Sequence, residues 1–437
     1  MLRSPRVLCV VSSFLILTAA PPAFAKPKDK HSLPPRAPAT VDHIVVVMME
    51  NRSFDHLLGW LPNANGRQTG LTYPAKDGSS HPTIPLAAPP LPDYQGCGHP
   101  DPDHSWEGGR IAYDDGKMDG FLLAGMNDDY AIGFYGEKDR PFHSALARTY
   151  TTFDNFFSSI LAETFPNRIF MHAAQTDRLE NSLTLSTLPT IWDRLIEKGV
   201  SARYYYSDVS FLWLWGIKYL PISARYEQFL SDAAAGTLPS VAFVEPRFLS
   251  EELGTSNDDH PHADIRAGDA FLAKTFHAVA NGPDWGSTVF IVTYDEWGGF
   301  FDHVAPPRAV APNNVDPDVV GGKALLGMRI PVVVASPFTR GDPMSPRVIS
   351  EVFDNTSILK LIEWRWNLKP LTARDASTDV GNLAFALDLA HPQLTVPALP
   401  HPASPSNVPV CIPLPFPDEV ELEDLDLLDP FRLVPTP

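Results

Sequence analysis

Cysteine is scarce in this chain. Only three cysteines occur among 437 residues, and Cys9 lies in an apolar stretch at the amino terminus, which leaves Cys97 and Cys411 for the rest. Two thiolates cannot build the four-ligand zinc cluster of a zinc finger. In an oxidising compartment they could instead pair and fasten the carboxyl-terminal segment to the early part of the chain. Spacing alone does not decide between a disulfide and two free thiols.

Positive charge is also in short supply. Lys and Arg number 34 against 52 Asp and Glu, so the formal net charge is -18. Loss of an amino-terminal segment with Arg3 and Arg6 would make the chain two units more negative. A strongly acidic surface argues against a nucleic-acid partner. It also disfavours attraction to anionic membranes, whereas neutral or zwitterionic lipid headgroups remain compatible with it.

Long apolar runs are lacking apart from one at the amino terminus. Two arginines precede this run, residues 7–20, and the small-residue sequence Ala23-Phe24-Ala25 follows it. The pattern predicts a signal peptide over residues 1–25 and a secreted or periplasmic protein. A membrane anchor is the alternative, but the run is shorter than the roughly 20 residues that span a bilayer. We therefore expect no transmembrane segment in the mature chain.

The rest of the sequence predicts a layered α/β fold. Residues 26–40 are a Pro- and Lys-rich linker, and residues 41–390 alternate apolar runs with helical patterns. The predicted buried strands are 43–49, 202–206, 241–244, 288–293 and 330–335, and predicted helices include 190–198, 265–279 and 356–366. Continuous β-branched runs are typical of parallel strands covered on both faces. Their alternation with helices indicates a mostly parallel central sheet.

The carboxyl-terminal segment, residues 391–437, is rich in proline and then acidic. The acidic part runs from Asp418 to Asp424. This composition predicts a surface extension that is partly disordered. A packed arm tied down by Cys411 is the alternative. We assign this segment no chemistry.

Glu50 and Asn51 follow the first predicted strand directly, at its carboxyl end. Open α/β sheets build their sites at this edge. One carboxylate oxygen and one amide oxygen could hold a divalent cation there. The alternative is a polar loop in which Asn51 only caps the helix that begins near Ser53.

Thr164 stands at the start of a second predicted helix. Pro166 suits the first helical turn, so Thr164 would lie where free backbone N–H groups favour an anion. Its hydroxyl is either an ordinary helix cap or a nucleophile at a phosphate site. From this segment alone the cap is favoured, because threonine is a preferred capping residue.

Three further clusters hold more polar groups than a core requires. The segment 257–264 includes His260 among several carboxylates, and the segment 101–106 includes His104. Asp295-Glu296 ends the strand 288–293, and Gly298-Gly299 then lets the chain turn back toward His303. Adjacent carboxylates at a strand end repel each other unless a cation lies between them. The pair is therefore a candidate second half of the arrangement at Glu50-Asn51.

Together these motifs resemble the bacterial phosphoesterase family of non-haemolytic phospholipases C and acid phosphatases, within the alkaline-phosphatase-like superfamily. The matching segments occur in the family's order and span about residues 41–385. They are 50–55, 164–168, 259–261, 294–304 and 356–359. One position departs from the family, because Asn355 stands where a histidine is frequent. The resemblance implies an alkaline-phosphatase-like, three-layer α/β/α sandwich with one site at the carboxyl ends of the strands.

The resemblance also implies residue roles. The ligands of one divalent metal ion would be Glu50, Asn51, Thr164, Asp295 and Glu296. Thr164 would be the nucleophile, which reverses the preference for a cap. His260, His303 and His104 would contact the phosphate. The metal stays unidentified: an oxygen-rich set suits Ca²⁺, Mg²⁺ or Mn²⁺, and nearby histidines leave Zn²⁺ and Fe open.

The expected activity is hydrolysis of a phosphodiester, on the headgroup side of a phospholipid, through a phosphothreonine intermediate. A broad acid phosphatase is the runner-up, and a secreted binding protein without catalysis is a further alternative. A diester needs apolar surface for its second substituent, which the aromatic segment 211–215 could supply, although core packing is the commoner role of such runs. The oligomeric state is not predicted.

Overall fold

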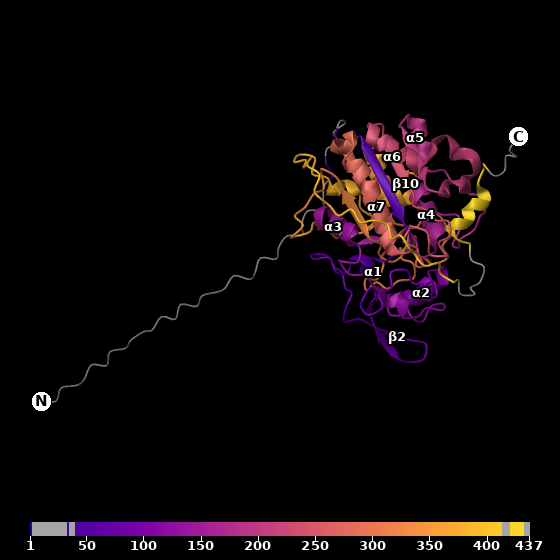
Figure 1. Cartoon of the computed structure of the whole chain (residues 1–437), viewed down its shortest axis with the longest axis vertical. Helices are drawn as coiled ribbons and strands as arrows, with labels where there is room; N and C mark the ends of the chain where they lie inside the picture. The colour runs from indigo at the N-terminus through magenta and orange to yellow at the C-terminus, as the bar shows by residue number, and fades with distance from the viewer. Residues whose placement is uncertain (2–32, 35–39, 413–419, 432–437) are drawn as a thin grey trace. The chain divides into compact units, whose positions relative to one another are not determined.

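The computed structural model describes residue 1 and residues 33–34, 40–412 and 420–431 (Figure 1). All residues of the predicted signal peptide except residue 1 lie outside this part of the chain, as does most of the predicted linker. Within the described residues, no helix is both long and apolar enough to cross a bilayer.

An eight-stranded sheet forms the centre of the fold. Its order is β16 (Val348–Ile349), β6 (Thr151–Phe153), β15 (Val332–Ala335), β11 (Thr288–Tyr294), β1 (His43–Met49), β10 (Val241–Val244), β8 (Ala202–Tyr206) and β9 (Ser223–Arg225). The strands from β11 to β9 are parallel. Every residue of β11 and all but one of β1 are buried, as their continuous apolar sequences predict. The prediction of a mostly parallel sheet is confirmed.

One predicted strand differs in its start and direction. Strand β15 begins at Val332 and not at Ile330, because Pro331 has no N–H group to donate to a neighbouring strand. It also runs antiparallel to both of its neighbours, β11 and β6. The sheet is therefore mixed on this side.

Helices cover both faces of the sheet (Figure 1). One layer contains α3 (Pro141–Thr149), α6 (Tyr226–Ala235) and α7 (Ile265–Ala280), which contact one another through α7. The other contains α4 (Thr164–Ala173), α5 (Ile191–Lys198), α8 (Thr356–Trp366) and the short α9 (Ala373–Ala376). The three helices expected from the sequence pattern are confirmed, and the fold is a three-layer α/β/α sandwich.

Smaller elements surround the sheet. The minor strands are β12 (Arg308–Val310), β13 (Val319–Val320) and β14 (Lys323–Leu325) in one sheet, and the pairs β2 (Thr72–Pro74) with β3 (Ser80–Pro82), β4 (Ile84–Pro85) with β5 (Gly133–Phe134), and β7 (Phe156–Phe157) with β17 (Phe353–Asp354). Two further helices, α1 (Phe54–Leu58) and α2 (Trp106–Tyr113), follow site segments. The 3-10 turns are η1 (Asp114–Gly116), η2 (Asp129–Ile132), η3 (Phe211–Ile222), η4 (Pro283–Ser287), η5 (Leu383–Ala386) and η6 (Leu422–Leu428).

The aromatic segment 211–215 lies inside the core. It forms the start of η3, and all five of its side chains are buried. Core packing is therefore its role, and it offers no exposed apolar surface to a substrate.

The carboxyl-terminal segment packs against the domain. A disulfide joins Cys97 to Cys411 across 314 residues. Further along, η6, drawn in yellow in Figure 1, contacts η3 and buries Leu422 and Leu425 completely. The packed arm, which was the alternative to a loose extension, is what the structure shows for residues 420–431. We call these residues the C-terminal arm.

Candidate active site

Glu50 and Asn51 lie at the carboxyl end of β1, where they were expected. Both side chains are fully buried. Asn51 has a left-handed backbone with φ of 54°, a conformation that asparagine tolerates better than most residues. The N-cap of α1 is Ser53, whose hydroxyl accepts a hydrogen bond from His56 N. Asn51 is thus not the helix cap, and its side chain is left to face the site.

Thr164 is the first residue of α4 and is also fully buried. The N-cap position belongs to Glu163, so the capping role considered for Thr164 is wrong. The Thr164 hydroxyl lies 3.4 Å from Glu50 Oε1 and 3.5 Å from Asn51 Oδ1. The packing of α4 against the sheet therefore brings this hydroxyl to the end of β1.

Asp295 links the two strand ends. Its Oδ1 accepts hydrogen bonds from Asn51 N at 3.1 Å and from Glu296 N at 2.7 Å. Its Oδ2 accepts one from Arg168 Nε at 2.8 Å. The next turn needs glycine, because Gly298 has φ of 59° and a side-chain carbon there would lie 2.2 Å from Asn51 O. This close approach fixes the two strand ends against each other.

The carboxylates of Glu50 and Glu296 are suited to a divalent cation, whereas both oxygens of Asp295 already accept hydrogen bonds. Glu50 Oε2 and Glu296 Oε1 are buried and have no hydrogen-bond partner among the described residues. Burial and the neighbouring Asp295 raise the pKa of Glu50 well above its usual value, although Arg168 opposes this shift. Burial also raises the pKa of Glu296 to about 8. Several carboxylates crowded in a buried space stay ionised only with a compensating cation.

Two further side chains adjoin these residues. His104 Nε2 lies 3.2 Å from Asn51 Nδ2, and His104 Nδ1 lies 2.9 Å from Pro102 O. Burial lowers the pKa of His104, but the carboxylates of Glu296 and Asp101 outweigh it and hold that pKa well above the usual value. Asn355, at the position that departs from the family pattern, donates from Nδ2 to Asp295 O at 3.1 Å. This hydrogen bond stabilises the backbone at the carboxyl end of β11.

His260 lies in a neighbouring cluster. It is fully buried, and its Nε2 is 3.5 Å from Asp101 Oδ2 and 3.8 Å from Glu252 Oε1. Its backbone carbonyl accepts a hydrogen bond from Arg52 at 2.9 Å, which ties it to the segment after β1. Asp101, Glu252 and His260 form this cluster. Asp101 connects it to His104, which adjoins Asn51, because the charge of Asp101 interacts with both His260 and His104.

His303 has different surroundings. Its Nδ1 pairs with Asp55 Oδ2, its Nε2 lies 3.2 Å from Asn65 Oδ1, and Arg329 neutralises Asp55 from the other side. Among the described residues, no contact joins His303 to Thr164 or to the proposed metal ligands. The phosphate-contacting role of His303 stays a prediction without support from this geometry.

Several charged residues at the site were not assigned a role from the sequence. Arg168 bridges Asp295 and Glu245, and Glu251 and Asp258 each bring an oxygen within 4.8 Å of one on Glu50. Arg168 belongs to the motif of Thr164, which is the signal that could have identified it. Glu245 directly follows β10 at the same edge of the sheet, so its position offered a similar signal.

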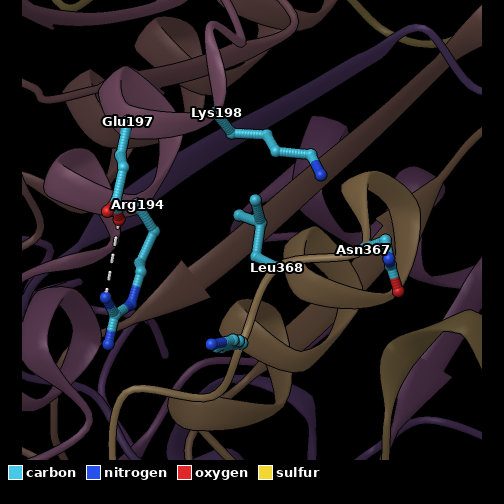
Figure 2. A pocket seen from close by; sticks show the side chains of 6 residues that line it. Arg194, Glu197, Lys198, Asn367 and Leu368 are labelled. Carbon is cyan, nitrogen blue, oxygen red and sulfur yellow. Dashed lines mark ion pairs between the residues drawn. The ribbon is translucent and has the colours of Figure 1, made fainter.

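A separate surface pocket lies between α5 and the end of α8 (Figure 2). The side chains that line it are Arg194, Glu197, Lys198, Asn367, Leu368 and Lys369. Arg194 forms an ion pair with Glu197 there. The pocket contains none of the residues expected at the active site.

Comparison with known proteins supports the resemblance found in the sequence. The model of the Phosphoesterase family matches residues 41–369. Non-specific phospholipase C1 of Arabidopsis thaliana is 31% identical over 85% of this chain and 75% of its own length. Phospholipase C A of Mycobacterium tuberculosis is 32% identical over 85% of this chain and 82% of its own length.

Solved structures show weaker likenesses. A protein of the alkaline phosphatase superfamily from Vibrio parahaemolyticus has a TM-score of 0.38 at 10% identity, over 80% of this chain and 71% of that one. Phosphonate monoester hydrolase of Agrobacterium radiobacter has a TM-score of 0.37 at 11% identity, over 80% and 78%. The fold class therefore rests on the sheet and its helices. The family match and the sequence relatives show that the chain belongs to the Phosphoesterase family and is a hydrolase of phosphoric ester bonds.

Proposed function

We propose that this protein is a metal-dependent phosphodiesterase of the phospholipase C type in which Thr164 is the nucleophile. The observation that carries the proposal is the position of the Thr164 hydroxyl, 3.4 Å from Glu50 Oε1, beside buried carboxylate oxygens that lack hydrogen-bond partners. The names of the relatives, which are phospholipases C, support the same reaction class.

The metal would be held by Glu50, Asn51, Asp295 and Glu296, together with the Thr164 oxygen. A bound divalent cation would lower the pKa of the hydroxyl and offset charge on the phosphate oxygens. These ligands are all oxygens, which suits a hard cation such as Ca²⁺, Mg²⁺ or Mn²⁺. Arg168 keeps Asp295 in place with its 2.8 Å bond and contributes a fixed positive charge.

In the proposed first step, Thr164 Oγ1 gives its proton to Glu50 Oε1, 3.4 Å away, and forms a bond to phosphorus. The bond between phosphorus and the oxygen of the leaving alcohol breaks, and that oxygen takes a proton from His260. Water then attacks phosphorus and gives one proton to His260. The bond between phosphorus and Thr164 Oγ1 breaks, Thr164 takes its proton back from Glu50, and the phosphorylated headgroup leaves. His104, beside Asn51, would hold a phosphate oxygen during both steps.

The proposal includes export. The amino-terminal pattern of residues 1–25 predicts a cleaved signal, so we propose that the enzyme works in the periplasm or outside the cell. A disulfide at Cys97 and Cys411 is in keeping with an oxidising compartment.

The test is substrate profiling of the purified enzyme with added divalent metal and with chelator. A phospholipase C should cleave p-nitrophenylphosphorylcholine better than p-nitrophenyl phosphate, and chelator should abolish both activities. A reversed preference would favour an acid phosphatase. Turnover of neither compound with metal present would favour a binding protein on this scaffold.

A further inference from the structure

The candidate active-site residues are closed to solvent. Thr164 and His260 are fully buried, and so are the proposed metal ligands Glu50 and Glu296. A phosphodiester has to place its phosphorus against the Thr164 hydroxyl before a bond can form. In this arrangement the hydroxyl is out of reach of a substrate, so some segment has to move before turnover.

The C-terminal arm lies next to this closed site. One side-chain oxygen of Glu421 is within 4.8 Å of His260 and of the two carboxylates that pair with it, Asp101 and Glu252. The side chains of Asp101 and Glu252 are 15% and 26% exposed, so the cluster lies just below the surface. Glu421 itself is buried. It therefore takes up space beside His260 that a substrate phosphate would need.

The carboxylate of Glu421 also opposes a phosphate electrostatically. Burial lowers the pKa of His104, but Glu296 and other nearby carboxylates, Glu421 among them, hold that pKa well above its usual value. Burial raises the pKa of Glu50, and Glu421 adds to this shift. The negative charge thus acts on both the histidines and the metal ligands. At buried positions such a charge repels another anion more strongly than in water.

The arm itself fixes the position of Glu421. Its side chain caps η6 by accepting a hydrogen bond from Asp424 N. Leu422 and Leu425 are fully buried and anchor η6, which contacts η3. The place of Glu421 in the site therefore depends on the docking of η6.

The arm is also the segment around His260 that can detach most easily. Beyond its two buried leucines, Leu427 and Phe431 are 67% and 62% exposed. Burial raises the pKa of Glu423, and the neighbouring Glu252 adds to the shift, so like charges meet where the arm contacts the domain. A segment with few buried apolar contacts and repelling charges opens at a low cost in free energy.

We propose that the C-terminal arm is an autoinhibitory cover, in which Glu421 excludes a substrate phosphate from His260 until η6 detaches from the domain. The inference rests on the proposed function, because it takes Thr164 and His260 as the groups that meet the phosphate. The disulfide between Cys97 and Cys411 holds the chain just before the arm. Detachment of η6 is therefore local and reversible.

The test releases the arm in the full-length, metal-loaded protein. The double variant Leu422→Ser with Leu425→Ser removes both anchors. Its kcat/KM for p-nitrophenylphosphorylcholine should rise about tenfold if the arm is detached in roughly a tenth of wild-type molecules. Leu427→Ser is the matched control, because this leucine is exposed on the same arm, and it should keep the wild-type value. Limited proteolysis should cut the arm sooner in the double variant than in the control.

Two further measurements separate a cover from a structural support. Glu421→Gln leaves both leucines in place and should lower KM for the same substrate by roughly threefold, because a carboxylate no longer opposes the phosphate. A synthetic peptide of residues 420–431 should inhibit the double variant competitively. The same peptide with serine at both anchor positions has the same charge, and it should not inhibit.

An unchanged or lower kcat/KM in the double variant, together with an unchanged KM in Glu421→Gln, overturns the inference and leaves the proposed function standing. If the double variant does not fold, the KM of Glu421→Gln decides. An active double variant beside an inactive wild type supports the inference. Failure of the wild type, the double variant and Glu421→Gln to cleave the diester with metal supplied overturns the proposed function itself.

Discussion

The hydroxyl oxygen of Thr164 lies 3.4 Å from Oε1 of Glu50, although 114 residues separate the two along the chain. One residue begins helix α4 and the other follows strand β1. Their contact joins the candidate nucleophile to the candidate metal site, and it makes the proposed chemistry open to direct tests.

Removing the hydroxyl should abolish turnover. We expect Thr164→Ala to lower kcat on a p-nitrophenyl diester by on the order of 10³-fold or more, because the covalent step has no other nucleophile. Thr164→Ser keeps a hydroxyl and should retain measurable activity. Mass spectrometry of a rapidly quenched reaction should find the phosphoryl group on the peptide with residue 164. Full turnover by Thr164→Ala would rule out this residue as the nucleophile.

Removing one ligand carboxylate should weaken metal binding. Loss of an outer partner of a metal site typically costs about 10–100-fold in affinity, so we expect at least this loss for Glu50→Gln. Elemental analysis and chelator titration would measure it. Metal that binds only the folded protein should also raise the melting temperature, and this gain should shrink in the variant. Glu227→Gln, on the exposed side of α6, is the control, and equal metal content in both variants would contradict the assignment.

Breaking the disulfide should destabilise the protein and release the arm. Cys97 and Cys411 close a loop of 314 residues, and loss of a native disulfide typically costs about 2–5 kcal/mol. The double variant Cys97→Ser with Cys411→Ser should therefore melt at a lower temperature. Limited proteolysis should cut the chain before the arm sooner than in the wild type. Equal melting and equal cleavage would show that packing alone holds the arm.

Glu363 should make stability depend on pH. Burial raises the pKa of this carboxyl to about 10, and the neighbouring Asp375 adds to the shift. The folded protein therefore keeps a proton at pH values where the unfolded chain has lost it, above a pKa of about 4.5. By linkage, the free energy of unfolding falls as pH rises between these two values, with a slope of up to about 1.4 kcal/mol per pH unit.

Glu363→Gln removes this titration while keeping the shape of the side chain. We expect the variant to be more stable than the wild type by about 1–3 kcal/mol at pH 8 and to differ little at pH 4. Chemical unfolding at several pH values would measure the difference, with Glu227→Gln as the control that follows the wild type. A stability difference that does not grow with pH would contradict the raised pKa.

The local sequence was enough to place the elements that carry the site. The continuous apolar runs of β1 and β11 have no polar face, so they can only be covered on both sides, and this predicts central strands. Glu50 and Asp295 directly follow these runs, and parallel strands bring their carboxyl ends to one edge. The sequence therefore determined the class of fold and the candidate metal site.

Contacts between distant segments were decided by the tertiary structure alone. The local sequence around Thr164 is the same whether its hydroxyl caps a helix or faces a metal ion. Only the position of α4 at the end of β1 distinguishes these two roles. The acidic run that ends in Asp424 looks like a solvated tail, because composition does not show what a chain packs against. The burial of Leu422 and Leu425 turns this tail into an arm and carries Glu421 to His260.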